Sequence, residues 1–141
     1  MEKFKEVFAF IFTILGSFLG FYFGEIDAFV YSLLCFVIAD YMTGILRAGV
    51  DGKLSSKIGF KGIAKKIMIF IIVGIGNLCD KNLIKSEPMI KTAIIFFYIA
   101  NEGISILENS LALGLPIPMK LKVLLEQFKE EKWLIVNWLM I

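Results

Sequence analysis

The sequence contains no histidine and only two cysteines among its 141 residues. The commonest general base and transition-metal ligand is therefore missing. Cys35 and Cys79 each lie inside an apolar run, without a CxxC motif or any other metal-ligand spacing. We interpret them as small buried apolar side chains and not as a disulfide framework. No metal and no cofactor are expected.

Charge and phosphate-binding motifs are also scarce. Charged residues make up 20% of the chain, and the net charge of +2 is too small to indicate a nucleic-acid partner. The phosphate-binding patterns GxxxxGKS/T and GxGxxG do not occur. No nucleophile, base and orienting group form a recognisable set. The sequence therefore predicts no catalytic residues and no enzyme.

Apolar side chains, in contrast, make up 58% of the chain and form long runs. A helix crosses a bilayer with about 20 mostly apolar residues, within a range of about 17–25. Four segments reach or approach that length: residues 7–24, 26–46, 60–79 and 89–107. The first run is longer than the central region of a secretory signal and is followed by no cleavage site, so we interpret it as a membrane span.

The expected fold is an all-α integral membrane protein with two parts. Residues 1–118 are predicted to form a bundle of about four transmembrane helices, with three as the alternative, and residues 119–141 an amphipathic helix. The third segment reaches spanning length only if Lys65 and Lys66 extend to the headgroups and the helix starts near Ser55 or Ser56. In the C-terminal helix, Trp133 and Trp138 suit the membrane interface.

Basic residues in short loops predict the orientation in the membrane. The connection before the third segment contains Arg47, Lys53, Lys57 and Lys61, whereas the connection GEID before the second contains no basic residue. The N-terminus and C-terminus are therefore expected on the cytoplasmic side of a four-span protein. If the first run does not cross, the same rule predicts three spans with the N-terminus outside.

Small residues follow one side of the first apolar segment. Gly16, Gly20 and Gly24 are spaced by four residues, which would place them on one helix face. In lipid, close packing at such a face is a main source of helix association. We expect either self-association of chains through this face or packing against the other segments of the same chain.

Polar side chains interrupt the other apolar segments at Asp40, Asn77, Asn101 and Glu102. An ionised carboxylate at mid-bilayer costs about 2.5–3.5 kcal/mol, so such a group must face protein or water. Two interpretations remain open. These groups form internal ion pairs, with Lys65 or Lys66 as partner of Asp40 or Glu102, or they line a hydrated surface when chains assemble.

The stretch DGKLSSKIGFKGIAKKIM, residues 51–68, is the most basic part of the chain. Together with the residues around it, it resembles the toxin-secretion/phage-lysis holin family. The family pattern is an Asp ending an apolar run, Thr-Gly, a loop with Lys and a Ser pair, Gly followed by Lys-Lys, and a second apolar run ending in Asp. The matching residues are Asp40, Thr43, Gly44, Lys53, Ser55, Ser56, Lys57, Gly62, Lys65, Lys66 and Asp80, with Lys61 inside the same stretch.

The resemblance implies a protein of the bacterial cytoplasmic membrane that contacts lipids and forms homo-oligomers. It implies pores or lesions through which a cell-wall-degrading endolysin, or a toxin, leaves the cell. The basic residues carry over as a family pattern and not as known pore-lining positions. Two other functions stay open on the sequence: a small channel or transporter, and a membrane adaptor that recruits a partner through its C-terminal helix.

Overall fold

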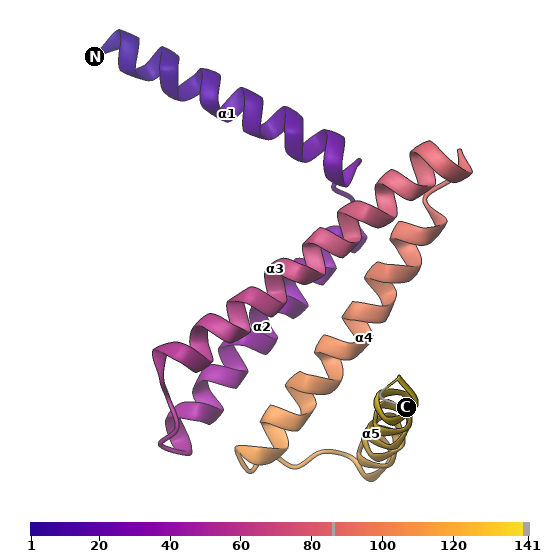
Figure 1. The fold of residues 1–141 in the computed structure, drawn as a ribbon. Helices are drawn as coiled ribbons and strands as arrows, with labels where there is room; N and C mark the ends of the chain where they lie inside the picture. Colours follow the sequence, from indigo (N-terminus) through magenta and orange to yellow (C-terminus); the bar gives the residue numbers. More distant parts are fainter. Residues whose placement is uncertain (86, 140–141) are drawn as a thin grey trace.

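In the computed structural model the chain folds into helices joined by short connections (Figure 1). The structure describes residues 1–85 and 87–139, and only the backbone of residues 125, 128, 129, 131–133, 135, 136, 138 and 139. The elements are α1 (Glu2–Phe23), α2 (Ala28–Val50), α3 (Ser56–Cys79), the π-helical turn η1 (Asp80–Ile84), α4 (Met89–Ala112) and α5 (Met119–Leu139). Within the described residues there is no strand, and the expected all-α fold is confirmed.

Local capping determines where two of the helices begin. The Asp27 side chain accepts hydrogen bonds from the amides of Phe29 and Val30, both at 3.0 Å, and so starts α2. Ser55 accepts from the amide of Ile58 at 3.3 Å and starts α3. These bonds satisfy amide groups that have no partner within the first turn of a helix. Of the two serines considered from the sequence, Ser55 is the cap.

Helices α2, α3 and α4 lie side by side and form the bundle (Figure 1). Each of the three contacts the other two, with the most extensive contact between α2 and α4. The buried apolar residues meet between them: Val30, Leu33 and Val37 of α2, Ile69 and Val73 of α3, and Ile95 of α4. This core is small for a chain of this hydropathy, because most large apolar side chains point outward.

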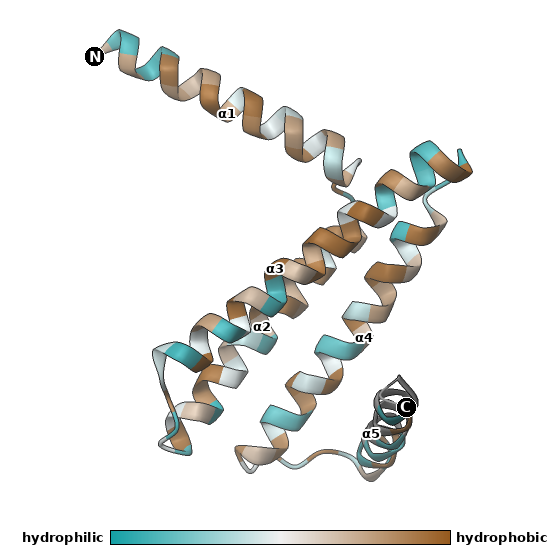
Figure 2. Cartoon of the chain, viewed as in Figure 1, coloured by the Kyte–Doolittle hydropathy of each residue, from teal (hydrophilic) through white to brown (hydrophobic). Residues whose placement is uncertain are grey.

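Apolar residues predominate along much of the helices (Figure 2), and most of the large ones are exposed, as expected of a membrane protein. Among the described residues, three helices are long and apolar enough to cross a membrane: α1, α2 and α4. Helix α3 has the same length as α4 but is not one of them, and its first eleven residues contain four lysines. Cys35 is exposed, contrary to its predicted burial, because it faces outward from the apolar surface of α2.

Helix α1 diverges from the bundle (Figure 1) and has no buried residue. Only its C-terminal end contacts α3, where the Tyr22 hydroxyl donates a 2.7 Å hydrogen bond to the carbonyl of Ile71. Phe23 packs edge-on against Phe70 of α3. The prediction of three glycines on one helix face is wrong for Gly24, which lies just beyond the end of α1 with φ of 68°. Glycine adopts this left-handed conformation without the strain of a side chain.

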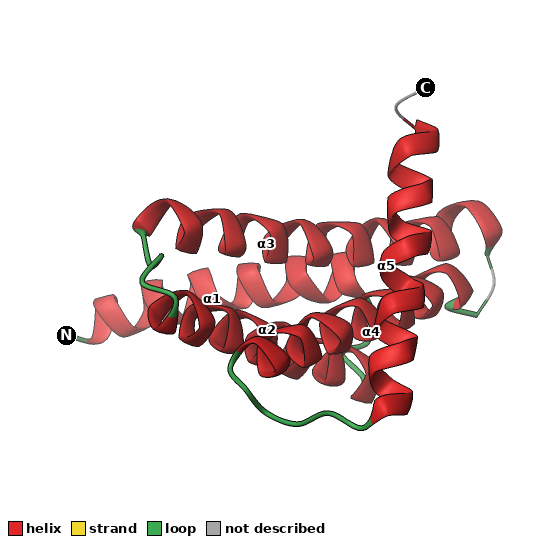
Figure 3. Cartoon of the chain, turned by 90° about the horizontal axis from the view of Figure 1, so that it is seen from below, coloured by secondary structure: helices red, strands yellow, loops and turns green. Residues whose placement is uncertain are grey.

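Helix α5 runs across the direction of the bundle helices (Figure 3) and stands apart from them (Figure 1). Its backbone is helical over Met119–Leu139, within the range of residues predicted for the C-terminal helix. Trp133 and Trp138 fall on this helix, but their side chains lie outside the described part of the structure. The predicted interfacial position of these two residues stays a prediction.

Candidate functional site

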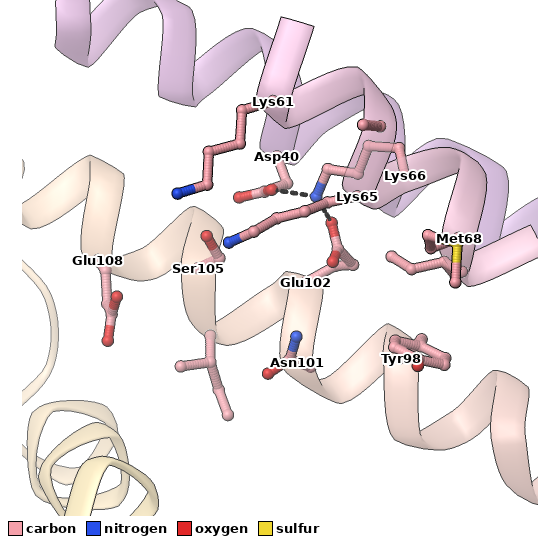
Figure 4. A pocket seen from close by; sticks show the side chains of 13 residues that line it. Asp40, Lys61, Lys65, Lys66, Met68, Tyr98, Asn101, Glu102, Ser105 and Glu108 are labelled. Carbon is pink, nitrogen blue, oxygen red and sulfur yellow. Dashed lines mark hydrogen bonds and ion pairs between the residues drawn. The ribbon is translucent and has the colours of Figure 1, made fainter. Parts of the chain in front are cut away.

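A buried ion triad joins the three helices of the bundle. Lys66 of α3 donates hydrogen bonds from Nζ to Oδ2 of Asp40 on α2 and to Oε2 of Glu102 on α4 (Figure 4). Asp40 is 9% exposed and Glu102 is 3% exposed. We name Asp40, Lys66 and Glu102 the triad. It connects one charged group from each of three helices at a single point inside an apolar bundle.

The triad continues into a line of hydrogen bonds toward the α2–α3 connection. The Asn109 amide nitrogen donates to Oδ1 of Asp40 at 3.4 Å and to the Thr43 hydroxyl at 3.1 Å. Arg47 donates to the Asn109 oxygen at 3.5 Å. The Thr43 hydroxyl also donates to the Asp40 carbonyl at 3.0 Å. Among the described residues, no buried side-chain nitrogen or oxygen lacks a partner.

The spacing of these residues explains why they meet. Asp40, Thr43 and Arg47 are separated by three and four residues, so they share one face of α2. Glu102 and Asn109 are seven residues apart and share one face of α4. The two polar faces turn toward each other because lipid offers no hydrogen-bond partner to either. Asn109 was not predicted from the sequence, although its seven-residue spacing from Glu102 is a usable signal.

The chemistry of the triad is that of a structural ion pair with an excess carboxylate. Two carboxylates share one ammonium, so the triad has a net charge of −1 when all three groups are ionised. Burial of such charges is tolerated when each is paired and hydrogen-bonded. In the described part of the chain, no three histidine, cysteine, aspartate or glutamate side chains gather as a metal site requires.

A second polar cluster closes the opposite end of the bundle. The Asp80 carboxylate, 2% exposed, accepts from the amides of Ile90 at 2.9 Å and Lys91 at 2.8 Å, and so caps the start of α4. The ammonium of Lys91, which is 4% exposed, donates to the carbonyl of Glu25 at 2.7 Å. These bonds tie the α1–α2 connection to the α3–α4 connection. Lys91 was not among the predicted site residues.

Asn77 belongs to this second cluster and not to the triad. Its amide nitrogen donates to the carbonyl of Tyr22 at 3.0 Å, and its oxygen would lie 2.5 Å from a Cβ placed on Gly24. The residue therefore satisfies a carbonyl that has no helical partner at the end of α1. Asn77 and Gly24 together hold the end of α1 against α3.

The remaining predicted residues line a cavity, pack against a neighbouring helix or lie on open surface. Lys61, Lys65 and Asn101 line a cavity of about 580 Å³ next to the triad. Gly62 lies against Tyr41 of α2, where an added Cβ would be 3.2 Å from the ring. Lys53, Ser56 and Lys57 are exposed near the start of α3. An added Cβ would meet no atom within 4 Å at Gly16 or at Gly20.

Two glycines that the sequence analysis did not single out make the closest contacts of α3. A Cβ placed on Gly74 would overlap the ring of Tyr22. One placed on Gly76 would lie 2.6 Å from the Ile94 side chain and 3.3 Å from the backbone of Lys91. They are two residues apart, so no four-residue spacing marked them in the sequence. Small residues allow helix backbones to approach closely in this way.

Comparison with known proteins gives one consistent result. The sequence profile of the bacteriophage holin family matches residues 17–130. An uncharacterised protein of Listeria monocytogenes is 49% identical over 78% of this chain and 78% of its own length. A 14.9 kDa protein of Clostridium perfringens is 42% identical over 84% of this chain and 89% of its own. A protein of Bacillus phage phi105 described as a probable holin is 33% identical over 68% and 70%. No solved structure matches significantly.

Proposed function

Because this chain belongs to the bacteriophage holin family, we propose that it is a holin that assembles into pores or lesions in the bacterial cytoplasmic membrane. Through these openings a cell-wall-degrading endolysin, or a toxin, leaves the cytoplasm without needing to contact the holin. The observation that carries the proposal is the triad. It places three ionisable groups from three helices inside an apolar bundle, so separation of the helices exposes polar surface to water.

The proposed topology has four spans with both termini in the cytoplasm. Helices α1, α2 and α4 have the length and composition of spans, and α3 lies along α2 and α4 as the fourth. The lysine-rich start of α3 and the end of α4 lie at the same end of the bundle, which suits the cytoplasmic side (Figure 1). Helix α5 runs crosswise, as a helix lying on the membrane surface does (Figure 3).

In the proposed resting state the polar groups satisfy one another within a single chain. Assembly then re-pairs the helices so that Asp40, Lys66 and Glu102 face water in place of one another. Such a change is feasible because water solvates the ions that the bundle otherwise holds in pairs. The membrane potential contributes as well, since moving one charge through 100 mV is worth about 2.3 kcal/mol.

Inducible expression of the chain in a bacterium, together with a cytosolic reporter enzyme, tests this function. We expect an abrupt loss of membrane potential and release of the reporter after a delay that shortens as the protein level rises. Leakage of ions without release of the reporter would indicate a small channel and not a holin. No leakage at a confirmed membrane level of the protein would favour an adaptor.

The face of α1 that contains Gly16 and Gly20 is the proposed contact between chains. The double variant Gly16→Leu/Gly20→Leu is expected to keep the monomer fold, because both positions are exposed and an added Cβ meets no atom within 4 Å at either, but to prevent close approach of two α1 helices. Cross-linking in membranes should show at least a several-fold loss of oligomers. The matched control is Ile11→Leu/Ile14→Leu, which changes exposed α1 residues without adding bulk to the glycine face. Equal oligomer formation by both double variants would contradict this interface.

A further inference from the structure

A cavity between α3 and α4 lies directly beside the triad, whose three residues form part of its lining. Its volume is about 580 Å³, within the range of sites that bind small molecules. From α3 it is lined by Lys61, Lys65 and Met68, and from α4 by Tyr98 and Ser105 (Figure 4). Asp40, Glu102 and Glu108 also line it, so the walls combine basic, acidic, hydroxyl and apolar groups in one space.

Two of the lysines in this cavity are not used by the bundle. Lys66 is held by the triad, whereas Lys61 and Lys65 have no ion-pair partner among the residues that the structure describes. Glu108 also lines the cavity, but its carboxylate points away from both ammonium groups (Figure 4), and it has an interaction of its own. The lining as a whole contains three ammonium groups and three carboxylates. Because Asp40 and Glu102 are both bound by Lys66, the two ammonium groups that the triad does not use are those of Lys61 and Lys65.

The lining changes from polar to apolar along the cavity. Lys61, Lys65 and Ser105 lie toward the start of α3, and Met68 and Tyr98 lie further along the bundle (Figure 4). Lys61 and Lys65 are five and nine residues beyond Ser56, which is about 8 Å and 14 Å by helical rise. In the topology proposed above, the basic end is at the depth of the cytoplasmic headgroups and the apolar end is at the depth of the acyl chains.

We propose that this cavity binds an anionic phospholipid of the cytoplasmic leaflet. The phosphodiester group, with one negative charge, lies between the Lys61 and Lys65 ammonium groups and accepts a hydrogen bond from Ser105. An acyl chain extends past Met68 and Tyr98. Basic cavities between helices on the cytoplasmic side bind anionic headgroups in this way. The site depends on the proposed orientation in the membrane, and it gives the resting chain a defined lipid partner beside its ion triad.

Native mass spectrometry of the full chain, released from nanodiscs of phosphatidylglycerol and phosphatidylcholine, tests the site. The wild type is expected to retain phosphatidylglycerol about tenfold more than phosphatidylcholine, and Lys61→Gln/Lys65→Gln to lose this preference. The matched control is Lys53→Gln/Lys57→Gln, which removes the same charge from the same basic stretch outside the cavity. It should retain the preference of the wild type.

Three results would overturn the proposal. The first is that Lys61→Gln/Lys65→Gln retains the preference for phosphatidylglycerol. The second is an equal loss of that preference in both double variants. The third is displacement of the lipid by millimolar inorganic phosphate, which would assign the site to a free anion. Circular dichroism checks that the variants are folded. Release of a trapped dye from vesicles is measured separately, so a failure of the lipid site is distinguished from a failure of pore formation.

Discussion

The substitution Lys66→Met is expected to destabilise the bundle by about 3–5 kcal/mol, which is the usual cost of removing one partner from a buried ion pair. Methionine retains much of the length and apolar volume of lysine but has no charge. The carboxylates of Asp40 and Glu102 would then face each other without a cation, at 9% and 3% exposure. Thermal unfolding of the purified protein in detergent, followed by circular dichroism at neutral pH, measures the loss.

Neutral replacement of the carboxylates provides the control for this prediction. The triple variant Lys66→Met/Asp40→Asn/Glu102→Gln removes the uncompensated charges while it keeps similar side-chain shapes, and it is expected to recover most of the lost stability. A matched single variant, Lys65→Met, removes the neighbouring lysine, which forms no part of the triad, and should be close to neutral. Equal destabilisation by Lys65→Met and Lys66→Met would contradict the special position of Lys66.

The same variants connect stability to function. If the triad holds the resting state together, Lys66→Met should permeabilise the membrane at a lower protein level than the wild type, and the triple variant should return the onset toward the wild-type value. The inducible reporter assay measures both onsets, once membrane levels have been matched by immunoblotting. An unchanged onset for Lys66→Met would show that the stability of the bundle does not determine the timing of release.

The substitution Gly76→Val is expected to destabilise the bundle by about 1–3 kcal/mol, which is the usual cost of overpacking a close contact. The new Cβ would lie 2.6 Å from the Ile94 side chain and 3.3 Å from the Lys91 backbone. Ile94 has other rotamers, but the Lys91 contact is relieved only if the backbone of α4 moves away from α3 by a few tenths of an ångström. Separation would also disturb the bonds from Asp80 to the start of α4. Thermal unfolding in the same detergent measures this loss.

Gly49→Val is the matched control for this prediction. Gly49 is also a helical glycine, near the end of α2, and an added Cβ there meets no atom within 4 Å. The control includes the ordinary cost of a β-branched residue in a helix without any overlap. A similar loss of stability in both variants would show that close approach at Gly76 is not a determinant of the bundle.

The sequence by itself predicted the class of the protein and the approximate extent of its helices. Long apolar runs are a local property of the chain and need no tertiary contact to be recognised. The cap at Ser55 is equally local, because the serine bonds to an amide only three residues away. The sequence also indicated that Asp40 and Glu102 must face protein or water, since the cost of a charge in lipid is independent of the fold.

Tertiary structure decided which groups meet. Lys65 and Lys66 are adjacent in sequence and equally suited to pair with Asp40, but successive residues point about 100° apart around a helix. Only the rotation of α3 against α2 and α4 places Lys66 in the triad and leaves Lys65 in the cavity. The same holds for Asn109, which meets Asp40 across 69 positions of sequence. Gly24 shows the converse, since its spacing suggested a helix face but α1 ends before it.

The difference between what the sequence predicts and what only the tertiary structure decides has one physical cause. Hydropathy, capping and charge distribution act over a few residues and are readable along the chain, so they determine that the helices form and that the protein belongs in a membrane. The rotation and axial position of each helix depend on the close approach at Gly74 and Gly76 and on the ion triad. These contacts join residues that are distant in sequence, so only the packed bundle specifies them.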